Sequence, residues 1–165
     1  MKNKINSISD DIKQLLLTGQ ETNIQLAFQL SIGLKGNYSE EVAQMLRKHL
    51  LLCFATGVEK DYFFETDTLD LSGIDLASIP IDFGQFTQLK KLNLAYTQVS
   101  KVPSGIFDLA QLEVLNLEGN SQLKKIPQGF ADLENLQELS LAGLDLTQDE
   151  VNAIRHWLPL VKVTF

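Results

Sequence analysis

The sequence predicts an α/β protein in which short parallel strands stack into a solenoid. An α-helical N-terminal region precedes the strands, and a helix-plus-strand C-terminal cap closes them. Three observations predict this class. A pattern of apolar residues repeats along residues 66–146, residues 1–65 show helical spacing without that pattern, and residues 147–165 combine a helix-start signal with an alternating strand.

The repeat divides into units 66–88, 89–111, 112–135 and a partial unit 136–146, so the complete units have 23, 23 and 24 residues. In the second unit the shared positions are Leu92, Leu94, Val99, Val102, Pro103, Ile106 and Leu109. The Leu-x-Leu step alternates with the period of a strand, and one such strand cannot bury its apolar face alone. We therefore expect stacked parallel strands, with a short helical or 3₁₀ turn after each proline on the opposite side.

The pattern LxxLxLxx(N/T)xLxx(I/V)Pxx(F/I)xxL resembles the 23-residue leucine-rich repeat of the intracellular, Ras-group type. The match covers about half of the chain, residues 66–146. This resemblance implies a short right-handed horseshoe with a parallel β-sheet, whose outward strand side chains form a concave binding face. The helical segment resembles a region that precedes the repeats of some bacterial leucine-rich repeat proteins, so we expect a bacterial source.

Helical spacing in residues 1–65 predicts three helices. The first begins at Ser9 and ends before Gly19, the second surrounds residues 24–30 and ends near Gly33 to Gly36, and the third runs from Ser39 to Gly57. One interpretation is a cap that folds onto the first strand, residues 66–71, because a solenoid exposes apolar core at each end. The alternative is a separate small helical domain that makes its own interactions.

The last segment, residues 147–165, predicts a C-terminal cap. Thr147 and Glu150 have the spacing of a capping box, which satisfies free N–H groups at a helix start. We expect a helix over Asp149–Leu158, stopped by Pro159, and a final strand over Val161–Phe165.

Composition and motifs disfavour several function classes. The net charge of −7 disfavours nucleic acid as a partner, and no apolar run is long enough for a membrane span. The chain shows no secretory signal and has a single cysteine, so we expect a cytoplasmic protein without disulfides. Neither metal-ligand spacing nor a phosphate-binding glycine loop is present, so we expect no cofactor and no enzyme. Cys53 lies on an apolar helix face, which favours a buried structural thiol over a reactive one.

The resemblance places positions 2, 3, 5, 7 and 8 of each unit on the concave face. We expect a non-catalytic module that binds a protein or peptide through this face, and we expect it to be monomeric. The predicted contact residues are Lys91, Asn93, Tyr96, Val114, Asn116 and Glu118. An alternative is a regulatory or structural scaffold whose helical N-terminal region makes the functional contacts.

Three features of this face have competing interpretations. Tyr96 stands among glycines at the same position of the other units, which indicates either a binding hot spot or a ring packed over the strand-to-loop bend. Lys90 lies between Asp67 and Glu113, which indicates either a surface charge ladder or ligand contacts. Asn120 begins the loop that holds the extra residue of the third unit, and we expect it to bond loop amides.

Overall fold

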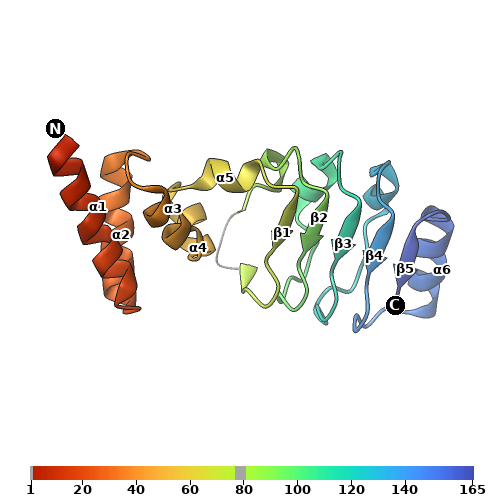
Figure 1. Cartoon of the computed structure of the whole chain (residues 1–165). Helices are drawn as coiled ribbons and strands as arrows, with labels where there is room; N and C mark the ends of the chain where they lie inside the picture. Colours follow the sequence, from red (N-terminus) through yellow and green to blue (C-terminus); the bar gives the residue numbers. More distant parts are fainter. Residues whose placement is uncertain (1, 77–80) are drawn as a thin grey trace. The chain divides into compact units, whose positions relative to one another are not determined.

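The C-terminal part of the chain forms one open sheet of five parallel strands that lie side by side in sequence order (Figure 1). The computed structural model describes residues 2–76 and 81–165, with side chains from residue 5 onward. The strands are β1 (Thr68–Asp70), β2 (Lys91–Asn93), β3 (Val114–Asn116), β4 (Glu138–Ser140) and β5 (Lys162–Thr164).

The register of the sheet places equivalent positions of successive repeats next to each other. Leu69 pairs with Leu92, Leu92 with Leu115, Leu115 with Leu139, and Leu139 with Val163. The four leucines of this row are at most 3% exposed, and so are Leu71, Leu94, Leu117 and Leu141 two positions later. The Leu-x-Leu step therefore builds the core, as the period-2 alternation predicts.

The side opposite the strands is made of short 3₁₀ helices: η2 (Phe83–Gln85), η3 (Ser104–Asp108) and η4 (Gln128–Asp132). Each buries one large apolar side chain, from Phe83, Ile106 and Phe130 respectively. Pro103 and Pro127 directly precede the second and third of these helices, which agrees with the predicted turn after each proline. The Ile79–Pro80 step of the first repeat lies outside the described residues.

The C-terminal cap agrees with its prediction within one residue. Helix α6 spans Gln148–Trp157, and its capping box is complete: Thr147 Oγ1 accepts from Glu150 N at 3.3 Å, while Glu150 Oε2 accepts from Thr147 N at 2.8 Å. The helix contacts η4 and buries Ile154. Helix α6 thus lies against the 3₁₀ helix of the third repeat unit, and β5 pairs with β4 at the edge of the sheet.

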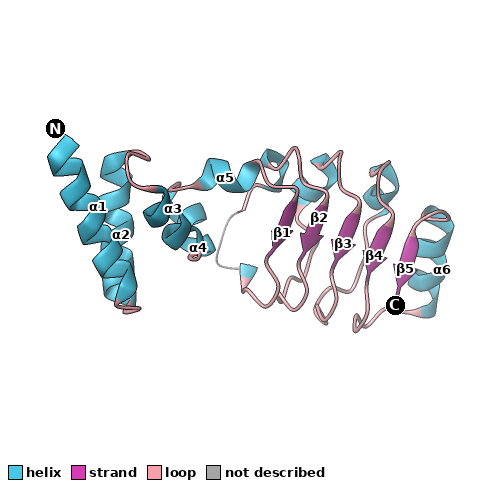
Figure 2. Cartoon of the chain, viewed as in Figure 1, coloured by secondary structure: helices cyan, strands magenta, loops and turns pink. Residues whose placement is uncertain are grey.

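Residues 1–62 form a compact unit of their own, and residues 63–165 form the second unit. The first unit is helical, as the cyan ribbons show (Figure 2). Its helices are α1 (Lys2–Leu17), α2 (Glu21–Leu34), α3 (Glu40–Arg47) and α4 (Leu50–Thr56), followed by α5 (Lys60–Phe64) at the junction of the two units. Helix α1 packs against α2 and α3, and α4 packs against α2 and α3.

Two predictions within this unit are wrong. Ser9 does not begin a helix: it lies inside α1, 8% exposed, because no proline or glycine interrupts the preceding residues. The predicted third helix is two helices, since His49 leaves helical geometry with φ −106° and ψ 59°. The apolar period continues across this break because α3 and α4 both bury their apolar side chains, so the pattern alone does not show it.

The remaining helix boundaries in this unit follow the sequence signals. Ser39 accepts a hydrogen bond from Val42 N and begins α3. Gly57 ends α4 in the left-handed conformation, with φ 74°, which glycine adopts without steric cost. The short helix α5 was not predicted, since it has only five residues.

Candidate binding surface

The six predicted contact residues come together on β2, β3 and the turns that follow these two adjacent strands (Figure 2). Lys91 pairs with Val114, and Asn93 pairs with Asn116, in the parallel register. Tyr96 and Glu118 lie in the two turns, where the hydroxyl of Tyr96 donates to Glu118 Oε1 at 2.7 Å. Six positions far apart in sequence thus form one continuous patch.

The polar row at the ends of the strands has a structural role that sequence reasoning missed. Asp70 Oδ1 accepts from Ser72 N at 2.9 Å, Asn93 Oδ1 from Ala95 N at 3.1 Å, and Asn116 Oδ1 from Glu118 N at 2.9 Å. Hydrogen bonds from the backbone and the side chain of Ser72, with a smaller contribution from the Asn93 side chain, hold the pKa of Asp70 below its ordinary value. Asn and Asp commonly stabilise turns in this way, so only the outer polar atoms of this row can reach a ligand.

Tyr96 packs over the strand-to-loop bend and is also exposed to solvent. Its backbone is left-handed, with φ 59°, and its ring lies over Gly119, where an added Cβ would come within 2.3 Å of the ring carbons Cδ1 and Cε1. The residue is nevertheless 54% exposed. The hydrogen bond to the Glu118 carboxylate raises the pKa of Tyr96. The ring is therefore held in one orientation over the bend, with its other face open to solvent.

Charges on this face are partly paired. Lys90 Nζ lies 3.3 Å from Glu113 Oε1, and Lys162 Nζ lies 3.1 Å from Glu138 Oε1. The ladder interpretation of Lys90 is thus reduced to one ion pair: no ion pair of Lys90 with Asp67 occurs within the described part of the chain, although Lys90 N donates to Asp67 O at 2.8 Å. Lys91 is exposed and forms no salt bridge with any described carboxylate, and Val114 beside it is half-buried.

The loop after β3 confirms the predicted role of Asn120, which is completely buried. Its Nδ2 donates to Leu94 O at 2.8 Å and Leu117 O at 2.9 Å, and its Oδ1 accepts from Val99 N at 3.2 Å. The extra residue of this unit is accommodated by a turn closed by Leu123 N and Asn120 O at 2.8 Å. The second repeat, residues 89–111, is one residue shorter, and there Gln98 adopts the left-handed conformation, with φ 60°.

Three further observations concern metal ligands, membrane-spanning helices and the single thiol. No group of three His, Cys, Asp or Glu side chains suited to hold a metal ion occurs among the described residues. Over the same residues, no helix combines the length and the apolar character that crossing a membrane requires. Cys53 is completely buried, and burial raises the pKa of its thiol to about 12.

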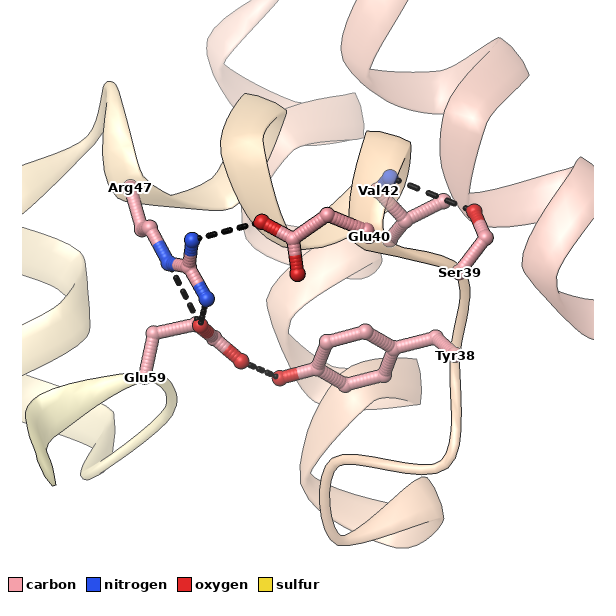
Figure 3. Close-up of polar contacts among 6 residues, drawn as sticks. All are labelled: Tyr38, Ser39, Glu40, Val42, Arg47 and Glu59. Atoms are coloured by element: carbon pink, nitrogen blue, oxygen red, sulfur yellow. Dashed lines mark hydrogen bonds and ion pairs between the residues drawn. The ribbon is translucent and has the colours of Figure 1, made fainter. Parts of the chain in front are cut away.

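A polar cluster in the first unit escaped sequence reasoning (Figure 3). Arg47 reaches Glu59 Oε2 through Nε and Nη2, both at 2.7 Å, and Glu40 Oε1 through Nη1 at 2.8 Å. The Tyr38 hydroxyl donates to Glu59 Oε1 at 2.6 Å, and the Tyr62 ring lies 4.0 Å from the Arg47 guanidinium. Burial and the bond to Glu59 raise the pKa of Tyr38. The cluster joins α3 to Tyr38 before it and to Glu59 and Tyr62 after α4, through side chains too distant in sequence for a local motif.

Comparison with known proteins agrees with this repeat geometry. The family model of the leucine-rich repeat matches residues 87–146. The chain contains leucine-rich repeats. Among solved structures, a leucine-rich repeat protein of Leptospira interrogans has 30% sequence identity and a TM-score of 0.53, over 60% of this chain and 25% of that protein. The leucine-rich repeat chain thus spans about a quarter of the length of that relative. No curated protein sequence matches it.

These comparisons confirm the leucine-rich repeat resemblance, and the open parallel sheet with its helical N-terminal region confirms the α/β solenoid. Leucine-rich repeats generally act as protein-interaction modules, because stacked strands present an extended surface. The bacterial source, the cytoplasmic location and the monomeric state remain predictions.

Proposed function

We propose that the chain is a non-catalytic module that binds a protein or peptide through the outward face of β2, β3 and the turns after them. The observation that carries this proposal is the Tyr96 ring, which is fixed over Gly119 and bonded to Glu118 while staying 54% exposed. An aromatic side chain that is already ordered loses little conformational entropy on binding, and tyrosine is enriched among binding hot spots.

The neighbours of Tyr96 support the same proposal. The exposed ammonium group of Lys91 has no carboxylate partner among the described side chains, and the Nδ2 group of Asn116 has no acceptor there. Val114 adds a half-buried apolar contact between them. A short sheet of this kind fits a peptide or a modest protein patch. The net charge of −7 makes a nucleic-acid partner unfavourable.

Affinity capture from a lysate, followed by affinity measurement with the purified partner, tests this proposal. The double variant Tyr96→Ala/Asn116→Ala removes an aromatic anchor and a hydrogen-bond donor from the face, and we expect its affinity to fall at least tenfold. Glu134→Gln serves as a control, since this exposed carboxylate lies outside the strands and the turns that follow them. Unchanged affinity of the folded double variant would contradict the assignment to this face.

A second candidate places the functional contacts on the helical first unit. The observation that favours it is a set of exposed apolar side chains on α1 and α2: Leu17 is 60%, Leu26 49% and Ile32 44% exposed. Scattered surface apolar residues are common, so this observation is weaker than the fixed ring of Tyr96. In the full chain, Leu26→Ser/Ile32→Ser would abolish partner capture if this candidate holds and would leave it intact if the sheet binds the partner.

A further inference from the structure

The concave face divides into two ends of different charge. At the amino-terminal ends of the strands, lysines and carboxylates alternate, with ion pairs from Lys90 to Glu113 and from Lys162 to Glu138. At the carboxyl-terminal ends, three rows follow one another across the sheet. They are Asp70, Asn93, Asn116, Ser140 and Thr164; then Ser72, Ala95, Glu118 and Ala142; then Gly73, Tyr96, Gly119 and Gly143. These rows contain two carboxylates and no lysine or arginine.

The two carboxylates at this end have no cationic partner. Asp70 is exposed and Glu118 is partly exposed, and neither forms a salt bridge with any residue the structure describes. Their hydrogen bonds come from neutral donors: the backbone and side chain of Ser72 and the side chain of Asn93 for Asp70, and the hydroxyl of Tyr96 for Glu118. Both carboxylates therefore keep their charge available to an incoming group.

The ring of Tyr96 adds a second feature that favours cations. One ring face lies on Gly119, so the 54% exposure of the residue belongs to the opposite face and the ring edge. The face of an aromatic ring carries negative charge density that attracts ammonium and guanidinium groups within about 6 Å. Because the hydroxyl is bonded to Glu118 Oε1, the open ring face and the carboxylate lie side by side.

We propose that the open face of Tyr96 and the carboxylate of Glu118 form a subsite for a lysine or arginine side chain of the bound partner. This inference rests on the proposed function, since it names which group the partner presents to the concave face. A planar guanidinium can stack on the ring while donating to the carboxylate, so arginine fits this geometry better than lysine. An acidic side chain would meet Glu118 and Asp70 without a neutralising cation.

A displayed library of random peptides, selected on the full chain, tests the subsite. Peptides that lose binding to Val114→Arg, a bulky block in the middle of the face, are taken as concave binders. Each is then synthesised with its arginine or with citrulline, which keeps the shape and removes the charge. We expect concave binders to carry arginine or lysine, and citrulline to weaken binding to the native chain about tenfold.

The variants separate the ring from the charge. Tyr96→Phe keeps the ring face and should retain part of the preference for arginine over citrulline, whereas Tyr96→Leu should lose more of it. Glu118→Gln should reduce the preference, and Glu118→Lys should remove it. Glu134→Gln neutralises a carboxylate outside the strands and the turns that follow them, and it should leave the preference for arginine over citrulline unchanged. Circular dichroism checks that each variant is folded.

The outcomes distinguish the subsite from the proposed function. Concave binders whose affinity does not depend on a cationic side chain would overturn the subsite and leave the concave binding face standing. The same holds if the arginine preference persists in both Tyr96→Leu and Glu118→Lys. If no selected peptide is sensitive to Val114→Arg, the binding face itself is wrong and the subsite with it.

Discussion

The side chains of Thr97 and Asn120, which occupy the same position in adjacent repeats, meet in complete burial with Thr97 Oγ1 3.2 Å from Asn120 Oδ1. The Thr97 hydroxyl also lies 2.8 Å from Leu94 O, an acceptor that it shares with Asn120 Nδ2. Asn120 additionally accepts from Val99 N. The pair thus satisfies buried and partly buried backbone groups of two adjacent repeats.

Asn120→Ala should strongly destabilise the compact unit formed by residues 63–165. The substitution leaves the partly buried N–H of Val99 and the buried carbonyl of Leu117 without their side-chain partner, so we expect a loss of about 3 kcal/mol. Thr97→Val should cost only about 1 kcal/mol, because Leu94 O keeps its bond from Asn120. Urea unfolding followed by fluorescence of Trp157, the single tryptophan, measures both in this unit.

A double-mutant cycle completes the test of this pair. Because Thr97 and Asn120 are in contact, their effects should deviate from additivity by at least about 0.5 kcal/mol. Ser121→Ala changes an exposed residue of the same loop and should be close to neutral. If Asn120→Ala were as mild as Ser121→Ala, the buried hydrogen bonds would not support the loop.

Gly119→Ala should displace the Tyr96 ring. An added Cβ would come within 2.3 Å of two ring carbons, and the backbone at Gly119 is left-handed with φ 71°. Once displaced, Tyr96 should lose its bond to Glu118, and its pKa should fall toward the ordinary value of about 10. Titration of the tyrosine ring carbons by nuclear magnetic resonance measures this change.

Gly73→Ala is the matched control for this substitution. Gly73 has the same left-handed backbone, with φ 72°, but no atom lies within 4 Å of its added Cβ. Both variants should lose about 1 kcal/mol of unfolding free energy because alanine disfavours the left-handed backbone. Only Gly119→Ala should alter the titration of Tyr96. Equal titration curves in the two variants would show that the ring does not rest on Gly119.

The repeats were predictable from sequence because their structure follows from a local period. Leu69, Leu92 and Leu115 recur every 23 residues, and stacking of parallel strands buries each of these leucines. The hydrogen bonds of Asn120 to loop backbone groups were equally predictable, since a buried polar side chain must find hydrogen-bond partners. The six candidate contact residues could be placed on one face by the same counting, although their partner could not.

Other features depend on tertiary geometry that no period encodes. The break at His49 interrupts a continuous apolar pattern, and the cluster of Arg47 with Glu59 joins residues 12 positions apart through the fold. The packing of Tyr96 on Gly119 arises from a left-handed backbone at a non-glycine residue. The sequence left both interpretations of Tyr96 open; the structure shows the packed ring, and the binding role remains a proposal.

Cys53 should be inert in the folded chain and reactive only after unfolding. The thiol is completely buried, its pKa is raised to about 12, and Sγ donates to Leu46 O at 3.3 Å. At pH 8, a thiol-specific aromatic disulfide should label the native chain only at the rate of unfolding and the denatured chain at once. Cys53→Ala should destabilise the first unit by about 1–2 kcal/mol. Rapid native labelling would show an accessible thiol instead.

Stability of the first unit should fall when the pH is lowered through 6.5. Burial, with a smaller effect of the charge on Lys48, lowers the pKa of His49 below its ordinary value of 6.5, and the ring meets Phe28 edge-on with 6.1 Å between the ring centroids. Between the folded pKa and 6.5, the unfolded chain takes up a proton that folded His49 does not. The unfolded state then binds more protons, so the free energy of unfolding decreases as pH falls and levels off below the folded pKa.

Urea unfolding followed by far-ultraviolet circular dichroism at pH 7.5 and pH 5.5 measures this dependence, because most of the helix lies in the first unit. His49→Gln should show a smaller loss of stability between the two pH values than the native chain, since other groups contribute equally to both. His156→Gln removes the other, exposed histidine and should behave like the native chain. A native pH dependence retained in His49→Gln would place its origin in another group, because a neutral side chain at this position cannot take up the proton.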